Sequence, residues 1–292
     1  EEQVLVHDRK GERRVSPFMV PMIMPNAPGA AISMRFGLQG PNETITTACA
    51  ASTHAIGYAT RLIQMGYADV VVSGGTESVM SPVGMAGFQN MTALSSSGQS
   101  KPFDKDRDGF MMTEGSATLV LEEMSSAQSR GANIYGEVLG SGSTADAHHI
   151  TAPAPGGDGA LRCMQLAIED SGLASTDIAS VNAHGTSTPL NDAAEAEALS
   201  KLFGEDGPPV TSTKGVTGHA LGAAGAIEAT AVLLSFLHKQ IPPTAGFVNR
   251  DPEMAGFNIV TGSGLEWEPG PSMSNSFGFG GHNGSIVLAP VN

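Results

Sequence analysis

The chain has 292 residues, with 15 Lys and Arg against 29 Asp and Glu, and its net charge is −14 with the His neutral. This acidic balance excludes the basic surface that nucleic-acid-binding proteins need. Hydrophobic residues make up 40% of the chain and 37 residues are Gly, a composition that is too apolar for a disordered protein and typical of a globular one.

The cysteine count indicates a reducing compartment, and the hydropathy indicates that no segment spans a membrane. Cys49 and Cys163 are too few for a disulfide framework, and no spacing suggests a zinc site. No run approaches the ~18 apolar residues of a membrane-spanning helix, and no secretory leader is visible. We therefore expect a cytoplasmic protein that does not enter a membrane.

From about residue 44, short β-branched runs alternate with longer Ala-rich segments at helical spacing, a pattern typical of α/β layers. In the first half, strands are predicted at residues 44–47, 69–72 and 116–122, the second closed by Gly74-Gly75. A helix that includes Ile56 and Leu62 and ends at Gly66 is predicted between the first two strands. Residues 76–115 have little periodicity and are predicted to be a long loop, which in a compact domain is usually either functional or disordered.

The second half repeats this alternation. The predicted strands are residues 134–139, 178–183 and 210–213, with further candidates at 258–260 and 285–288, and the predicted helices are 160–170, 192–203 and 222–238. No stretch is long, polar and low in complexity, so no linker is predicted and the two groups of strands and helices should pack together.

Cys49 is the first candidate for chemistry. It follows a predicted strand and precedes a helix, so its sulfur should face the first-turn amides, which lowers a thiol pKa and favours the thiolate. A strand-to-helix turn is also a recurrent position for a nucleophile. The alternative is a small buried hydrophobic residue, which is our interpretation of Cys163 within its helix.

Two histidines lie in loops that follow predicted strands. His184 belongs to Asn182-Ala183-His184-Gly185-Thr186-Ser187-Thr188, and His219 ends the segment that begins at Ser212 and includes Lys214. Either histidine alone is more often structural. Together with Cys49 they form three strand-end loops, and in α/β folds such loops bind ligands at one edge of the sheet.

The segment from Asn275 to Gly284 contains two phenylalanines among four glycines. Glycine permits close approach and movement of the backbone, so an aromatic residue here could act as a gate and a backbone N–H could bind an oxyanion. A simple turn before the last strand is the alternative. Gly74-Gly75 and Gly222 to Gly225 lack the spacing of a phosphate loop, so no nucleotide site is predicted.

These motifs together resemble the elongating β-ketoacyl-[acyl carrier protein] synthases, close to synthase II. The resemblance rests on Thr47-Ala48-Cys49, Asn182 to Thr188, Lys214 with His219, Asn275 to Asn283, Asp104 to Phe110 and Pro242-Pro243-Thr244. It implies an α/β, thiolase-like, five-layer αβαβα fold of two similar halves. Relative to the family the chain begins roughly a hundred residues in, about one small domain, so the N-terminal half is expected to be incomplete. Residues 1–130 would carry the nucleophile, and 131–292 both histidines and the gating loop.

The resemblance also implies roles for individual residues. Cys49 would accept the acyl group, His184 and His219 would act on malonyl carrier protein as neutral rings, and Lys214 with Glu228 would set the electrostatics and oppose protonation of the rings. The remaining implied assignments are pantetheine contacts for Thr186 and Thr188, a gate and oxyanion N–H for Phe279, a pocket wall for Phe88, substrate contacts for Phe277 and Gly278, support by Asn275, and a monovalent cation near Asn182, Glu228 and Asn275.

The implied reaction is a decarboxylative Claisen condensation. An acyl group on Cys49 would react with malonyl-[acyl carrier protein] to give 3-oxoacyl-[acyl carrier protein] and CO₂ in fatty acid elongation. No cofactor is expected, because phosphopantetheine arrives on the carrier. The expected partners are acyl carrier protein, its acyl and malonyl thioesters, and a second copy in a homodimer. The densest basic cluster, Arg9-Lys10 with Arg13-Arg14, is either a docking site for the acidic carrier or a solvated face.

Three alternatives remain open from the sequence. A ketosynthase of a polyketide or long-chain, mycolic-type pathway would share these catalytic residues, and His282 in Gly281-His282-Asn283 hints at a long-chain elongase. A chain-length-factor-like, non-catalytic partner would share the fold but lack the nucleophile. A Cys-His hydrolase would need neither a carrier protein nor a second histidine.

Overall fold

A mixed five-stranded sheet forms the centre of the second half of the chain. The computed structural model describes residues 1–291, and residue 292, the last of the predicted C-terminal half, lies outside them. The strand order is β3-β9-β8-β4-β5, and the strands are β3 (Glu137–Ala145), β4 (Ser180–Asn182), β5 (Val210–Thr211), β8 (Ser272–Gly278) and β9 (His282–Ala289). β4 is parallel to β5 and β8, whereas β9 is antiparallel to β8 and β3.

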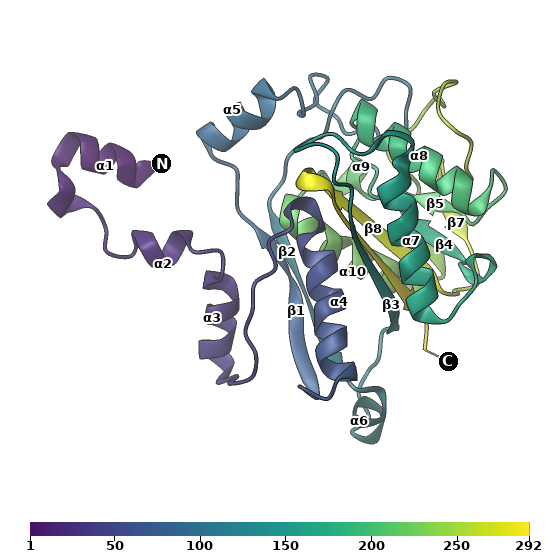
Figure 1. Cartoon of the computed structure of the whole chain (residues 1–292), viewed down its shortest axis with the longest axis horizontal. Helices are drawn as coiled ribbons and strands as arrows, with labels where there is room; N and C mark the ends of the chain where they lie inside the picture. Colours follow the sequence, from purple (N-terminus) through teal and green to yellow (C-terminus); the bar gives the residue numbers. More distant parts are fainter. Residues whose placement is uncertain (292) are drawn as a thin grey trace.

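A second, two-stranded sheet pairs β1 (Val70–Glu77) with β2 (Gly115–Glu122) in antiparallel register. Helices α4 (Ala51–Gln64) and α10 (Ala224–His238) lie between the two sheets, while α7 (Asp158–Ser171) and α8 (Pro189–Phe203) cover the far face of the five-stranded sheet (Figure 1). The layers run α, β, α, β. Within residues 1–291 no helix layer covers the outer face of β1 and β2.

Two apolar clusters hold these layers together. One lies between the five-stranded sheet and helices α7 and α8, and the other lies between the two sheets around α4 and α10. The first includes Met164, Leu199 and Met273, and the second includes Ile56, Val232 and Ile286. The interior is thus built from Ala, Val, Leu, Ile and Met, because aromatic residues are scarce in this chain.

The first 43 residues differ from the rest, because α1 (Glu2–Lys10), α2 (Met19–Ile23) and α3 (Ala27–Phe36) contain no buried residue. They extend away from the two sheets (Figure 1), and the Val83 N–H donates to Glu1 Oε1 of this segment at 3.0 Å. The remaining short elements are α5 (Pro82–Asn90), α6 (Met124–Ser129), α9 (Lys214–Thr217), β6 (Gln240–Ile241), β7 (Leu265–Glu266), η1 (Glu12–Arg14), η2 (Ala48–Ala50), η3 (Pro155–Gly157), η4 (Ser175–Asp177), η5 (Leu221–Ala223) and η6 (Phe279–Gly281).

All four predicted helices are confirmed, with ends that move by a few residues, as is the strand at 116–122. The predicted strands at 134–139, 178–183, 210–213 and 285–288 are shifted or shortened to β3, β4, β5 and β9. The helix expected from residue 222 opens as the 3₁₀ turn η5 before α10 begins. Helical periodicity identified these segments well because each helix buries one continuous face.

Several strand predictions were wrong. Residues 44–47 pair with no described strand. They are therefore not a strand, since a strand needs hydrogen bonds to a neighbouring one. β1 continues through Gly74 and Gly75 to Glu77 instead of ending there, and 258–260 forms only a single bridge, Ile259 with Val210. The glycine-rich segment from Asn275 to Gly284 contains the end of β8, the turn η6 and the start of the last strand, β9, so the turn weighed as one alternative is present. The loop at 76–115 contains α5.

Leu221–His238 has the length and composition of a membrane-spanning helix, contrary to the expectation that no segment comes close. Half of this segment is buried, and α10 packs between the two sheets. The burial accounts for its apolar character as that of a core helix. The division at residue 130 stays a prediction, and Arg130 is the C-cap of α6.

Candidate active site

Three loops meet at the carboxyl edge of the five-stranded sheet. His184 follows β4, Lys214 and His219 follow β5, and Phe279 follows β8. Because β4, β5 and β8 run parallel, their carboxyl ends open on the same edge, where ligands bind in such sheets. Cys49 reaches this edge from the other half, in η2 before α4.

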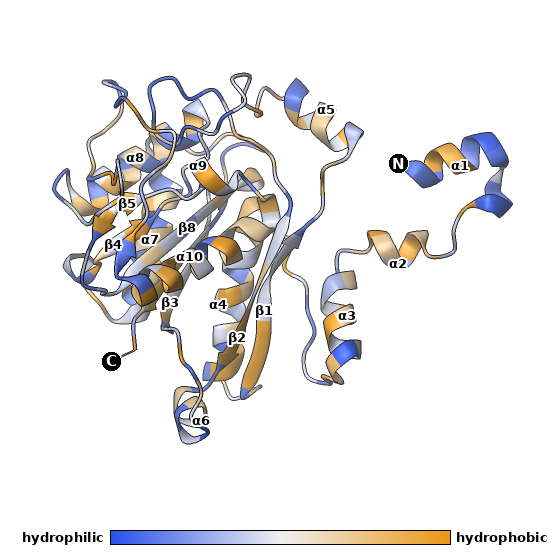
Figure 2. Cartoon of the chain, turned by 180° about the vertical axis from the view of Figure 1, so that it is seen from behind, coloured by the Kyte–Doolittle hydropathy of each residue, from blue (hydrophilic) through white to orange (hydrophobic). Residues whose placement is uncertain are grey.

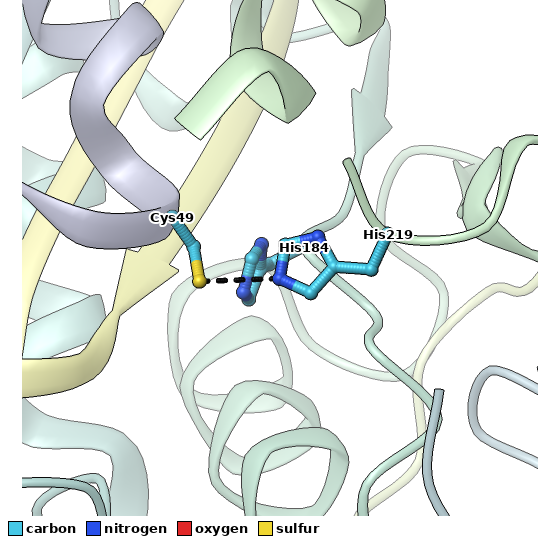
Figure 3. Close-up of side chains that lie close together, drawn as sticks. All are labelled: Cys49, His184 and His219. Carbon is cyan, nitrogen blue, oxygen red and sulfur yellow. Dashed lines mark hydrogen bonds between the residues drawn. The ribbon is translucent and has the colours of Figure 1, made fainter. Parts of the chain in front are cut away.

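Cys49, His184 and His219 lie together, as the sequence predicted. His219 Nε2 lies 3.1 Å from Cys49 Sγ, and one donor atom from each of the three residues falls within 4.8 Å of the others (Figure 3). The two imidazole rings are 5.4 Å apart and nearly perpendicular. All three side chains are buried, with Cys49 8% exposed and each histidine 1%.

The protonation of Cys49 differs from the prediction. Burial raises the pKa of its thiol to about 11, although Lys214 and the backbone N–H groups of Phe279 and Cys49 oppose this rise. Desolvation of the sulfur therefore outweighs the Lys214 charge and the two backbone N–H groups that favour the thiolate. At neutral pH the resting group is a thiol, not the expected thiolate.

Both histidines are neutral, as expected. Burial lowers the pKa of His184 and of His219 well below the usual range, and the nearby Lys214 ammonium adds to the effect. Lys214 Nζ donates to His184 Nδ1 at 3.3 Å, so the proton of that ring lies on Nε2. The Nδ1 atom of His219 has no hydrogen-bond partner among residues 1–291, so no neighbour selects its tautomer.

Lys214 and Glu228 form an ion pair that is fully buried, as the resemblance implied. Burial raises the pKa of Glu228 to about 7, although the Lys214 ammonium opposes the rise. Glu228 Oε2 has no partner among the described side chains. The ammonium of this pair lies beside His184.

Two backbone N–H groups point at the reacting sulfur, those of Cys49 and Phe279. A Cβ atom at Gly278 would lie 3.0 Å from Cys49 N and 2.9 Å from Thr47 O, so glycine is needed for the close approach of β8 to the nucleophile. Ala48, just before Cys49, has a φ of 50°, a left-handed conformation that costs energy in a non-glycine residue. Both N–H groups therefore face the sulfur, and their role as an oxyanion pair stays a prediction.

The other implied site residues surround this centre. Thr186 and Thr188 hydroxyls lie 2.9 Å apart, and the Phe277 ring lies 5.9 Å from His184. Phe88 does not reach the histidines itself but packs on Phe110 at 5.8 Å, and Phe110 lies 4.9 Å from His219. Their contacts with pantetheine and the acyl chain stay predictions.

The residues implied for a cation do not all come together. Asn182 has no partner for either of its side-chain polar atoms among the described residues, like Glu228 Oε2. Asn275, however, turns to the α7 face, where its amide contacts Met164 and accepts from Ser285 at 2.8 Å. Neighbouring strand residues face opposite sides of a sheet, and Ser276 is bonded to Thr53 of α4 on the other side.

Cys49, His184 and His219 also offer donor atoms that a soft metal could use. The surroundings do not suit one, because the Lys214 ammonium donates to His184 and places a positive charge beside the cluster. The cluster is better suited to proton transfer and hydrogen bonding to an anion.

Three residues around the site were missed in the sequence. Glu195 accepts the N–H groups of His184 and Gly185 at 2.8 and 2.7 Å, and Asp192 accepts those of Phe103 and Ser187. Burial raises the pKa of Glu195 to about 7 and of Asp192 to about 6. Two acids on the inner face of a predicted helix were the available signal. The third, His54, bonds Thr47 and Asn283 and left no sequence signal.

Two family models match this chain, one in each half. Residues 1–127 match the model described as β-ketoacyl synthase, N-terminal domain, and residues 135–248 match that described as β-ketoacyl synthase, C-terminal domain. The chain is 46% identical over 295 aligned residues to 3-oxoacyl-[acyl-carrier-protein] synthase 2 of Synechocystis sp., covering 99% of this chain and 70% of the relative.

Solved structures share the same fold. A β-ketoacyl synthase from Burkholderia phymatum superposes with a TM-score of 0.94 at 36% identity, over 100% of this chain and 72% of that one. A type II polyketide ketosynthase in complex with its acyl-carrier protein superposes with a TM-score of 0.94 at 31% identity, over 100% of this chain and 74% of that one. The expected layered α/β, thiolase-like fold is confirmed, with part of the relatives' length not represented in this chain.

Proposed function

This chain belongs to the β-ketoacyl synthase family, and on that premise we propose that it is an acyltransferase that elongates acyl chains by decarboxylative Claisen condensation. Its substrates are an acyl thioester and malonyl-[acyl carrier protein], and its products are 3-oxoacyl-[acyl carrier protein] and CO₂. The observation that carries the proposal is the buried contact of Cys49 Sγ with His219 Nε2 at 3.1 Å, with His184 alongside.

The first half of the reaction loads the acyl group. The Cys49 thiol passes its proton to His219 Nε2 as the sulfur attacks the thioester carbonyl, and the oxyanion accepts hydrogen bonds from the Cys49 and Phe279 N–H groups. Collapse of this intermediate expels the carrier thiolate, which takes the proton from His219. An acyl group then remains on Cys49.

The second half forms the carbon–carbon bond. The malonyl carboxylate leaves as CO₂, and its bonding electrons pass into an enolate whose thioester oxygen accepts hydrogen bonds from the Nε2–H groups of His184 and His219. His219 carries its proton on Nε2 at this stage, because its Nδ1 has no bonded neighbour among residues 1–291 and the ring changes tautomer once the thiol is acylated. Lys214 holds the His184 proton on Nε2, the nitrogen that serves as donor. The enolate carbon attacks the acyl-Cys49 carbonyl, and the same two backbone N–H groups hold the new oxyanion until the Cys49 sulfur departs as a thiolate. The thiolate takes up one proton from water and returns to the resting thiol, which balances the proton that left on the carrier thiol.

The buried, neutral histidines suit this role. A neutral ring donates a hydrogen bond without being a strong acid, so it can stabilise the enolate without protonating the carbon that must attack. Lys214 supports this state because its positive charge opposes a second charge on His184. No metal or cofactor takes part in these steps, and phosphopantetheine enters only on the carrier.

The carrier, a homodimer and a cytoplasmic location complete the proposal. The relative from Synechocystis is named for an acyl-carrier-protein substrate, and a solved relative is bound to its acyl-carrier protein. The basic residues Arg9, Lys10, Arg13 and Arg14 lie exposed on α1 and η1, where an acidic carrier could reach them. Fatty acid elongation is favoured over a polyketide pathway by the name of the 46% identical relative. The presence of Cys49 argues against a non-catalytic partner.

Two measurements test the proposal. Mass spectrometry after incubation with an acyl carrier thioester should find one acyl adduct on the Cys49 peptide, with Cys163 as the internal control. An adduct on Cys163 instead would exclude Cys49 as the nucleophile. His184→Ala and His219→Ala should each slow release of CO₂ from malonyl carrier protein by about 100-fold, whereas undiminished release in both variants would remove the histidines from the mechanism.

A further inference from the structure

His54 lies on α4, one turn beyond Cys49, and its ring is bonded at both nitrogens. Nδ1 lies 2.7 Å from the hydroxyl of Thr47, two residues before the nucleophile, and Nε2 lies 2.9 Å from the backbone carbonyl of Asn283 in β9. The two bonded residues are far apart in sequence and belong to opposite halves of the chain.

The Asn283 carbonyl fixes which atom donates and which accepts in both hydrogen bonds of His54. A carbonyl can only accept, so Nε2–H donates to Asn283, and the neutral ring then accepts the Thr47 hydroxyl proton at Nδ1. Burial lowers the pKa of His54, which keeps the ring neutral. A Cβ at Gly284 would lie 3.0 Å from the ring, so β9 rests directly on the imidazole.

One of these bonds lies next to the Cys49 N–H in the chain, and the other holds the hairpin that carries the Phe279 N–H. Thr47 precedes the left-handed Ala48 and Cys49, so its hydroxyl bond restrains the turn that aims the Cys49 N–H. Asn283 pairs with Phe277 across the hairpin whose turn is Phe279–Gly281. The Asn283 amide also bonds Asp146, and the Asp146 N–H donates to Gly281 O at 2.9 Å.

We propose that His54 is a positioning residue that sets the separation of the Cys49 and Phe279 N–H groups by tying the nucleophile turn to the gate hairpin. The inference rests on the function proposed above, because an oxyanion forms only in acyl transfer. Thr53 of α4 also bonds Ser276 of β8 at 2.8 Å. His54 differs from Thr53 because it bonds both the turn that carries the Cys49 N–H and the hairpin that carries the Phe279 N–H.

The expected loss in acylation rate follows from how strongly stabilisation of the oxyanion depends on the positions of its N–H donors. Loss of one donor costs about 100- to 1,000-fold in rate in other enzymes, and misplacement by about 1 Å costs about 100-fold. Loosening one tie leaves both donors present but less well aligned, so we expect a loss of about 10- to 100-fold in Cys49 acylation.

Each of three variants removes one of the two hydrogen bonds made by the His54 ring. His54→Asn keeps an acceptor near Thr47 but cannot reach Asn283, His54→Gln keeps a donor for Asn283 but not the acceptor for Thr47, and Thr47→Val removes the hydroxyl while His54 stays. The matched control is Arg61→Met, which cuts the bond from the same helix to Asp170 of α7, away from the sulfur. Thermal unfolding confirms that each variant is folded.

The experiment compares two reactions of the same sulfur. Acylation by an acyl thioester passes through an oxyanion, whereas alkylation by iodoacetamide does not, and mass spectrometry of the Cys49 peptide measures the rate of each. We expect the three variants to slow acylation by about 10- to 100-fold. Alkylation should slow much less, because it depends on the two N–H groups only through the pKa of the thiol. Arg61→Met should change neither rate.

Each other result contradicts the inference. An equal fall in acylation and alkylation would show general loosening of the fold, and unchanged acylation would show that the ties do not align the donors. A fall in acylation alone in Arg61→Met would show that any loosening of α4 has this effect. Failure of the wild-type protein to form an acyl adduct at Cys49 is a separate outcome, and it would overturn the proposed function together with this inference.

Discussion

The two halves of the chain are covered to very different degrees. In the five-stranded sheet, β8 and β9 are buried along almost their whole length, with Met273, Ile286 and Val287 fully inaccessible. In the two-stranded sheet, Val70 is 50% and Val120 64% exposed, and hydrophobic residues colour these strands on the outside of the fold (Figure 2).

The active site crosses the boundary between these two halves. The histidines, Lys214 and the gate come from the well-covered half, whereas Cys49 comes from the half with the exposed sheet. The nucleophile is therefore aligned by contacts with the other half, at Gly278 and, through His54, at Asn283, more than by its own sheet. This difference can be tested by removing contacts within the buried half, across the boundary and on the exposed sheet.

The largest expected effect is that of Lys214→Met, which leaves Glu228 buried without its partner. Breaking a buried ion pair costs about 3–5 kcal/mol of unfolding free energy. Burial already raises the pKa of Glu228 to about 7 from its usual 4.5, so charging this group opposes folding as the pH rises through that window. Denaturant unfolding should show a small loss at pH 5 and a large one at pH 8.

The double variant Lys214→Met/Glu228→Gln is the control for this prediction. It removes both charges, so most of the stability lost at pH 8 should return. A loss that is the same at pH 5 and pH 8, or that persists in the double variant, would mean that packing of the lysine chain and not the unpaired carboxylate is responsible.

The next effect compares the two sheets. Ile286→Ala removes a fully buried side chain between the sheets and should lower the unfolding free energy by about 2–5 kcal/mol. Val120→Ala removes an exposed side chain of β2 and should change it by less than about 0.5 kcal/mol. Equal losses in urea unfolding would show that the outer face of β1 and β2 is covered in solution, for example by a second copy of the chain.

The last comparison concerns catalysis, and it uses Gly278→Ala. The added methyl group would lie 3.0 Å from Cys49 N, so it should push the nucleophile turn away from β8 and slow Cys49 acylation by about 10- to 100-fold. Acyl adduct formation followed by mass spectrometry measures the rate. Gly87→Ala in α5 is the matched control, because no atom lies within 4 Å of the new methyl group.

Gly87→Ala should leave acylation unchanged and stabilise α5 by about 0.5–1 kcal/mol, because alanine is the better helix former. If the two glycine variants slowed acylation equally, the close approach of β8 to Cys49 would have no special role.

Much of this site could be predicted from the sequence because the signals were local. Cys49, His184 and His219 each follow a predicted strand or begin a helix, and Lys214 lies within the same short motif as His219. The helices were found because burial of one face leaves a periodic pattern. Strand limits were less accurate, since the pairing of residues 44–47 and 258–260 depends on neighbours far away in the chain.

The amino-acid sequence alone determined the family resemblance, the chemical groups of the site and the order in which the chain presents them. Only the tertiary structure decided that Cys49 rests as a thiol and that Asn275 faces away from Asn182, because desolvation and strand facing depend on packing. The same holds for His54, whose two bonds join residues more than 200 positions apart, at 47 and 283. Such contacts leave no periodic trace in the chain, since nothing local distinguishes a bridging histidine from one that is merely buried.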